Sequence, residues 1–331
     1  MNQHELIAEV FERQAKRRVE RRAFLKFAGM STAVAGAAAL SACGGGGGDG
    51  DGFGVDNNVN VPPPQTGLSD ADILNFALNL EYLEAQFYSF AATGAGLPDN
   101  LLTGTGTQGG VTGGRPVAFT DQVVRLYANE IAADERAHVA FLRTALGSAA
   151  VAQPAIDISS DVNGPFSAAA RAAGLVGAGQ SFDPYASDEN FLLGAYIFED
   201  VGVTAYKGAS PLIQSPTFLS AAAGILGAEA YHAGLIRTVL YGKGIAMPAL
   251  IDATEAISDA RDSLDNPEDV DQGVRRMGDA SNIVPADENA IAFSRSAGDV
   301  LNIVYLNAGA VDEGGFFPNG VNGPINTSTA D

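Results

Sequence analysis

The sequence predicts an all-α protein: a four-helix bundle with a long connection between its second and third helices and an extension of helix and loop at its C-terminus. Apolar residues recur at helical spacing in four segments, and Gly, Pro, Asp and Ser gather between these segments. The connection between the second and third segments is long enough to cross from one end of a bundle to the other. An apolar fraction of 46% is normal for a chain that buries a core.

The first two helices are predicted at about 70–92 and 120–147. Ser69 is a suitable N-cap for the first helix, and two aspartates follow it in the first turn, where acidic residues are favoured. Residues 93–118 are dense in Gly, Thr and Pro and are expected to form a loop. The second helix is expected to end near Gly147.

The third and fourth helices are predicted at about 187–209 and 217–242, with two prolines between them. Residues 148–186 form the long connection and include a short predicted helix around 167–173. The bundle is therefore expected to span residues 69–244.

Residues 245–331 are expected to form a C-terminal extension that packs on the bundle. One helix is predicted there at about 286–307, and a tail rich in Gly, Asn and Pro follows it. We expect this extension to be a cap on the bundle and not an independent catalytic domain.

The charge of the chain excludes some classes of partner. The formal net charge is −20, and residues 43–331 carry 12 basic against 35 acidic side chains. Such a surface repels phosphate backbones, so the sequence disfavours nucleic-acid binding. Cations are the expected charged partners.

Residues 1–42 have the layout of an export signal. A basic segment that contains Arg21 and Arg22 precedes an uncharged run rich in Ala and Gly over 27–42. The run is too short for a convincing membrane span, which needs about 20 apolar residues. The arginine pair before Phe-Leu-Lys resembles the bacterial twin-arginine signal, and this resemblance implies export of a folded protein.

Cys43 is the only cysteine, so the chain cannot form an intramolecular disulfide. Together with the Leu-Ser-Ala before it, Cys43 resembles the lipobox of bacterial lipoproteins, which implies a lipid anchor in a membrane and a periplasmic or cell-surface location. Residues 43–68, rich in Gly, Asp and Pro, would then be a flexible tether. The alternative is an unmodified thiol after an ordinary signal peptide.

The fourth predicted helix carries the strongest functional signal. Between Thr217 and Ile236 its only Asp, Glu, Lys, Arg or His side chains are Glu229 and His232, which share a stripe with core residues. A buried carboxylate costs several kcal/mol unless it is paired or binds a metal. A compensating charge is therefore expected beside Glu229.

The second predicted helix repeats this arrangement. The segment that begins at Glu135 and contains His138 aligns without gaps on the segment that begins at Glu229, with Glu, His, Arg, Thr and Leu coinciding. The first and third helices form another pair, since Glu81 lies seven residues before Tyr88 and Glu199 seven before Tyr206. Seven residues are two helical turns, which puts each tyrosine on the face of its glutamate.

Both histidines after the export signal thus belong to Glu-x-x-His motifs. The order of motifs resembles the ferritin-like di-metal carboxylate superfamily, whose bundles take a Glu from each of two helices and Glu-x-x-His from each of the other two. The resemblance covers about 70–242 and implies a ferritin-like four-helix bundle. It implies a ligand set for two metal ions: Glu81, Glu135, His138, Glu199, Glu229 and His232.

The residues around the glutamates, 79–84 and 198–204, and the tail 314–320 resemble one branch of this superfamily. These are the exported ferritin-like domain proteins that include the desiccation-related proteins of resurrection plants. The resemblance does not decide the activity of the branch.

Several residues near the predicted ligands allow two interpretations. Tyr88 and Tyr206 are either core aromatics or hydrogen-bond partners of ligand glutamates, and Glu84 and Glu130 are reserve ligands. Asp134 and Asp200 adjoin ligands but point about 100° away, toward solvent or a second layer around the site. Two arginines, Arg143 and Arg237, either neutralise carboxylates or cover apolar surface.

Carboxylates and imidazoles without thiolate suit iron or manganese, and such a site handles peroxide or dioxygen. The leading hypothesis is an exported oxidoreductase of the cell envelope with two Fe or Mn ions, active in oxidative or desiccation stress. The alternatives are a metal-binding protein without turnover and a structural stress protein with a relic site. The sequence does not choose Fe over Mn, name a reductant, or show whether two bundles form a homodimer.

Overall fold

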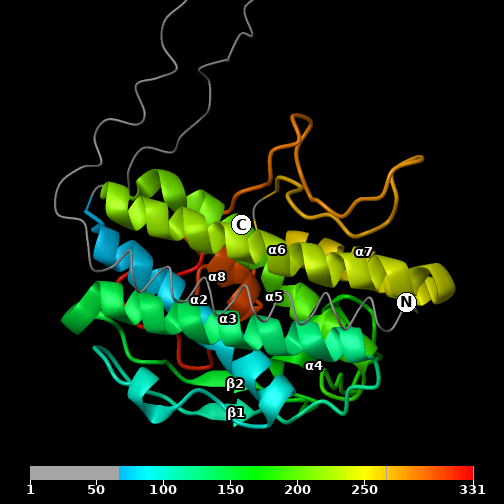
Figure 1. Ribbon diagram of the computed structural model, residues 1–331, viewed down its shortest axis with the longest axis horizontal. Coiled ribbons are helices and arrows are strands. Elements are labelled where there is room, and N and C mark those ends of the chain that lie inside the picture. Colours follow the sequence, from blue (N-terminus) through cyan, green and yellow to red (C-terminus); the bar gives the residue numbers. More distant parts are fainter. Residues whose placement is uncertain (1–66, 266, 331) are drawn as a thin grey trace, which may run out of the picture. The chain divides into compact units, whose positions relative to one another are not determined.

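The computed structural model describes residues 67–265 and 267–330 (Figure 1). The predicted export signal, the lipobox cysteine and the tether up to residue 66 lie outside this part. The described part is all-α apart from two short strands, as predicted. Its four long helices are α2 (Asp70–Thr93), α3 (Gln122–Leu146), α5 (Asp188–Ala209) and α6 (Pro216–Ala246).

The four helices begin where the sequence supplies caps. Ser69 forms a capping box with Asp72 at the start of α2, and Asp121 accepts the first free N–H groups of α3. Ser187 and Ser215 cap α5 and α6 in the same way. The predicted starts are therefore within a few residues of the observed ones.

The helices form two hairpin pairs. Helix α2 packs chiefly on α3 and α5 chiefly on α6, with lighter contacts between α2 and α5 and between α3 and α6. Figure 1 shows α3 and α6 running lengthwise on the near side of the bundle. Helices α2 and α5 are buried along nearly their whole length, whereas α3 buries one stripe.

The two long connections of the bundle meet in a small sheet that the sequence did not predict. Strand β1 (Val111–Gly113) pairs in parallel with β2 (Ile156–Ile158). Each strand has only three residues, too few to show a period in the sequence. Helix α4 (Pro165–Ala172) then confirms the short helix expected in the long connection.

The end of the fourth helix was predicted too early. Glycines at 242 and 244 continue the helix to Ala246, and the residue before Pro248 ends it. Pro248 then opens α7 (Pro248–Asp262), which the sequence analysis missed although its buried side chains recur at helical spacing.

The C-terminal helix is shorter than predicted. Helix α8 (Ala297–Tyr305) begins only at Ser296, where a capping box with Asp299 forms. The residues before it turn back on themselves, with Ala290 at φ 61°. Helices α7 and α8 pack against α5, and α7 also packs against α6 and α4.

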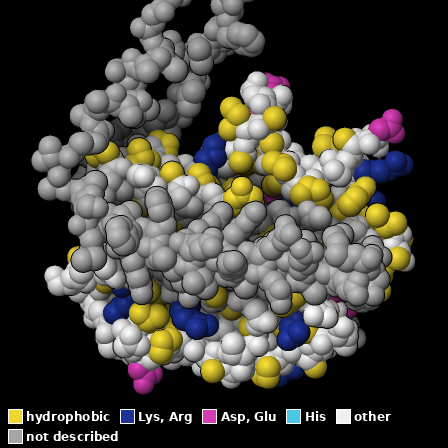
Figure 2. Space-filling view, in the orientation of Figure 1, with side chains coloured by type: hydrophobic (Ala, Val, Ile, Leu, Met, Phe, Trp, Pro, Cys, Tyr) yellow, Lys and Arg dark blue, Asp and Glu magenta, His cyan; other side chains and the backbone are white. Residues whose placement is uncertain are grey.

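Helix α6 has apolar and small residues all around, and its outer side carries exposed apolar side chains such as Leu219, Tyr231 and Ile245. Figure 2 shows apolar side chains gathered along this side of the molecule. No helix in the described part of the chain is long and apolar enough to span a membrane.

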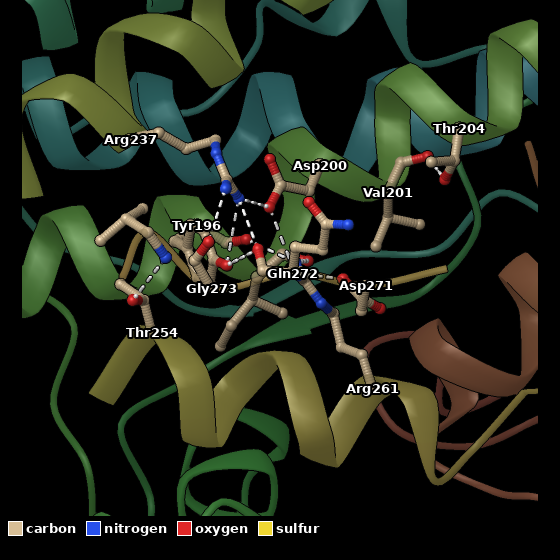
Figure 3. Close-up of polar contacts among 12 residues, drawn as sticks. Tyr196, Asp200, Val201, Thr204, Arg237, Thr254, Arg261, Asp271, Gln272 and Gly273 are labelled. Carbon is tan, nitrogen blue, oxygen red and sulfur yellow. Dashed lines mark hydrogen bonds and ion pairs between the residues drawn. The ribbon is translucent and has the colours of Figure 1, made fainter. Parts of the chain in front are cut away.

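A buried network of charged side chains joins the bundle to the extension (Figure 3). Asp200 of α5 binds Arg237 of α6 at 2.7 Å and Arg261 of α7 at 3.2 Å. Arg261 also binds Asp271, 2.5 Å away, and Asp271 in turn binds Arg295. Since these groups are nearly all inaccessible to water, each charge depends on its neighbour.

Arg237 is the centre of this network and was misread in the sequence. Its side chain is fully buried, so it is not a surface arginine, and it pairs with Asp200 and not with a predicted ligand. It also donates to four backbone carbonyls of the extension, at residues 272, 273, 282 and 283. The extension is thereby hydrogen-bonded to the C-terminal half of α6.

Candidate metal centre

The six predicted ligands come from the four long helices and meet inside the bundle. Helices α2 and α5 each supply one glutamate, and α3 and α6 each supply a glutamate and a histidine one turn later. The four glutamates are 0–1% exposed. The site therefore lies within the apolar core, where a bare carboxylate is costly.

One group of ligand atoms contains Glu81, Glu135, His138 and Glu229, all within 4.8 Å of one another. His138 Nδ1 lies 3.2 Å from Glu81 Oε2, 3.3 Å from Glu229 Oε1 and 3.7 Å from Glu135 Oε2. Three carboxylates thus converge on one imidazole nitrogen. This is a donor set for one metal ion.

A second group contains Glu199, Glu229 and His232. His232 Nδ1 lies 3.8 Å from Glu199 Oε2 and 3.0 Å from Glu135 Oε1. Glu135 and Glu229 each approach both histidines, so they occupy the place between the two groups. The six residues could therefore hold two ions, with Glu135 and Glu229 placed between the two groups.

The helix pairs α2–α3 and α5–α6 are two repeats of the ligand pattern, and each tyrosine donates to the glutamate of the other repeat. Tyr88 of α2 donates to Glu199 of α5, and Tyr206 of α5 donates to Glu81 of α2. The sequence put each tyrosine on the face of its own glutamate but could not show which carboxylate it reaches. These bonds fix one oxygen of each terminal carboxylate and leave the other directed at a histidine.

Asp134 supports the second histidine from outside the site. Its Oδ2 lies 3.5 Å from His232 Nε2, and its side chain is 43% exposed. This contact directs Nδ1 of His232 toward the carboxylates. Asp200, the other aspartate beside a ligand, belongs to the network with Arg237 and Arg261.

The reserve ligands and Arg143 lie in different places. Glu84 is buried on α2 beside the site, whereas Glu130 is half-buried on α3; neither belongs to the two groups of closely spaced atoms. Arg143 donates to the Tyr82 hydroxyl and the Thr103 carbonyl and pairs with no predicted ligand.

Within the part of the chain that the structure describes, most of the buried polar atoms without a hydrogen-bond partner belong to this site. Of eleven buried side-chain atoms without a hydrogen-bond partner in the described part, six belong to the predicted ligands. They are both oxygens of Glu135, both of Glu229, Oε2 of Glu199 and Nδ1 of His232. His232 Nδ1 and Glu135 Oε1 lie 3.0 Å apart but form no hydrogen bond. Since buried polar atoms are nearly always satisfied, these atoms fit a bound cation.

Without a metal, protons must balance the carboxylates. Burial raises the pKa of Glu81 to about 8 and raises the pKa values of Glu199 and Glu229. Burial also opposes ionisation of Glu135, but the neighbouring imidazoles outweigh it and lower its pKa to about 2. The carboxylates around His232 overcome the effect of burial and raise its pKa to about 12. Metal binding would therefore release protons.

The donor set restricts the metal. Hard carboxylate oxygens with two imidazole nitrogens and no thiolate fit iron or manganese, and the small number of protein donors around each position leaves room for further ligands. The residues present thus fit a pair of Fe or Mn ions.

Comparison with known proteins gives the same picture. The model of the ferritin-like domain family matches residues 69–242. The chain is 29% identical over 269 residues to ferritin-like catalase Nec2 of Nesocodon mauritianus, covering 78% of this chain and 85% of the relative. It is 29% identical over 248 residues to desiccation-related protein PCC13-62 of Craterostigma plantagineum, covering 69% of this chain and 75% of the relative.

No solved structure matches the chain. The family match extends over more than half of the sequence and contains all six predicted ligands. Fold, ligand arrangement and sequence similarity thus agree, and the protein belongs to the ferritin-like domain family.

Proposed function

We propose that this protein is exported to the cell envelope, holds two Fe or Mn ions in its bundle, and reacts with hydrogen peroxide or dioxygen in protection against oxidative or desiccation stress. The observation that carries the proposal is the convergence of two Glu-x-x-His motifs and two further glutamates on one buried volume. The similarity to a protein named a ferritin-like catalase supports peroxide as the substrate.

Peroxide disproportionation is the form of this reaction that needs no outside reductant. One peroxide molecule is oxidised to dioxygen while a second is reduced to two molecules of water, so electrons and atoms balance. The bound ions would supply the two-electron exchange. The chain would position the ions through its shared carboxylates and exclude bulk water.

Small molecules would approach between α3 and α6. These helices contact each other lightly, and both histidines belong to them. The His138 side chain is 12% exposed and Asp134 lies at the surface beside His232, whereas the glutamates are inaccessible. A molecule as small as peroxide fits such an approach better than a bulky organic substrate.

Metal analysis followed by peroxide addition tests the proposal. Protein purified without chelators should hold about two Fe or Mn ions per chain and turn over many equivalents of peroxide. Stoichiometric oxidation without turnover would favour the alternative, a metal-sequestering protein. A protein that holds no metal, and whose stability ignores added Fe2+ or Mn2+, would favour a scaffold with a relic site.

Export and anchoring rest on the twin-arginine-like pair Arg21-Arg22 and on Cys43. A Cys43→Ala variant should leave the membrane fraction and appear in the soluble exported fraction. An Arg21→Lys/Arg22→Lys variant should remain in the cytoplasm. Membrane retention of the Cys43→Ala variant would contradict lipidation.

A further inference from the structure

Glu84 is a buried carboxylate that the six-ligand set does not use. It lies one turn beyond Glu81 on α2 and is 5% exposed. Among the described residues, no hydrogen bond or ion pair reaches its carboxylate. Burial of an uncompensated carboxylate costs several kcal/mol, so its presence in the core needs a reason.

Gly202 of α5 faces this carboxylate and leaves room for it. A Cβ at Gly202 would lie 3.3 Å from Glu84 Oε1 and 3.0 Å from Oε2 of the ligand Glu229. By contrast, a Cβ at Gly224 or Gly227 of α6 would meet nothing within 4 Å. The missing side chain at 202 therefore accommodates two carboxylates, one of them a ligand shared by both groups.

Glu84 and Gly202 occupy equivalent places in the two repeats. Each follows its ligand glutamate by three residues and precedes its tyrosine by four. The crossed bonds from the tyrosines show that α2 and α5 run antiparallel, so these two positions face each other midway between the terminal ligands. One repeat thus has a carboxylate, Glu84, at the position where the other has Gly202 and no side chain.

We infer that Glu84 is a fifth carboxylate of the metal centre and makes its two metal positions unequal. This inference rests on the proposed metal site. Four carboxylates balance two divalent ions, whereas a fifth adds a negative charge that favours a trivalent ion in one position. The equivalent position of the other repeat, Gly202, has no side chain to balance Glu84, so the two halves of the centre carry unequal charge.

A titration with Mn2+ tests whether Glu84 contributes to binding. In the mature metal-free protein, Glu84→Gln should weaken the binding of one of two Mn2+ ions by about 10–100-fold. The affinity for the other ion should remain nearly unchanged. Glu288→Gln, which removes the same charge from an exposed position of the C-terminal extension outside both groups, is the control and should bind both ions as the wild type does.

Iron provides a readout of the charge. After anaerobic loading with Fe2+, potentiometric titration should give a higher reduction potential for Glu84→Gln than for the wild type, because loss of a negative charge disfavours Fe3+. The potential of the Glu288→Gln control should match that of the wild type. An unchanged or lower potential in Glu84→Gln would contradict the charge argument.

Gly202→Ala is a second variant that keeps every carboxylate. Its added methyl group would press on Glu84 and Glu229 and is expected to weaken Mn2+ binding, while circular dichroism verifies that each variant is folded. Two Mn2+ ions bound to folded Glu84→Gln with wild-type affinities would overturn this inference alone. Failure of the wild type itself to bind Mn2+ or Fe2+ would overturn the proposed function.

Discussion

Replacement of Arg237 by Met tests whether the buried network holds the C-terminal extension on the bundle. Methionine keeps a long apolar stem but removes the charge and all donors. Asp200 would lose the 2.7 Å partner and keep only Arg261, and four carbonyls of the extension would lose their donors. Removal of one partner from a buried ion pair lowers the free energy of unfolding by about 3–5 kcal/mol.

Each carbonyl left without any partner would add about 1–3 kcal/mol, but residues 272, 282 and 283 are partly exposed, so water should replace the lost donor at most of them. We therefore expect a loss of about 3–5 kcal/mol in the free energy of unfolding, which is roughly a 10 °C decrease in Tm for a domain of this size. Denaturant and thermal unfolding in EDTA would measure both changes without a contribution from bound metal.

Arg143→Met is the matched control, because Arg143 is the repeat partner of Arg237. It donates to the Tyr82 hydroxyl and one carbonyl and forms no buried ion pair, so its loss should cost about 1 kcal/mol. Limited proteolysis should cut residues 265–295 faster in Arg237→Met only. Equal stability losses in the two variants would refute the reasoning.

Three further predictions concern the metal centre. The metal-free protein should lose stability as pH rises from about 5 to 9: the folded-state pKa values of Glu81 (about 8) and His232 (about 12) lie above those of the unfolded chain, so the folded state binds more protons. Each group changes the free energy of unfolding by up to about 1.4 kcal/mol per pH unit. In EDTA, a midpoint of urea unfolding that rises with pH would contradict this prediction. Tyr206→Phe removes the hydrogen bond to Glu81 and should weaken Mn2+ binding by about 10–100-fold, as measured by calorimetry. Tyr231→Phe, at an exposed tyrosine of α6, is the control. Addition of Mn2+ at 1,000 times its Kd should stabilise the protein by about 4 kcal/mol, whereas a His138→Ala/His232→Ala variant should show little stabilisation.

The sequence predicted the four bundle helices well because local signals define them. Caps such as Ser69 and Asp121 and the spacing of apolar residues depend only on neighbours in the chain. The same locality explains three errors at and after the end of the bundle: the glycines after Tyr241 did not stop α6, α7 was missed, and the turn around Ala290 interrupted the predicted last helix. These boundaries depend on how the extension packs on the bundle.

The sequence by itself determined the ligand pattern, since two Glu-x-x-His motifs and two glutamates on apolar stripes require a compensating charge wherever the helices bury them. Only the tertiary structure decided how these residues meet. It paired each tyrosine with the glutamate of the opposite repeat, buried Arg237 against Asp200, and set Glu84 against Gly202. The physical reason is that helical periodicity fixes which face a side chain occupies, whereas its partner on another helix depends on how the helices pack.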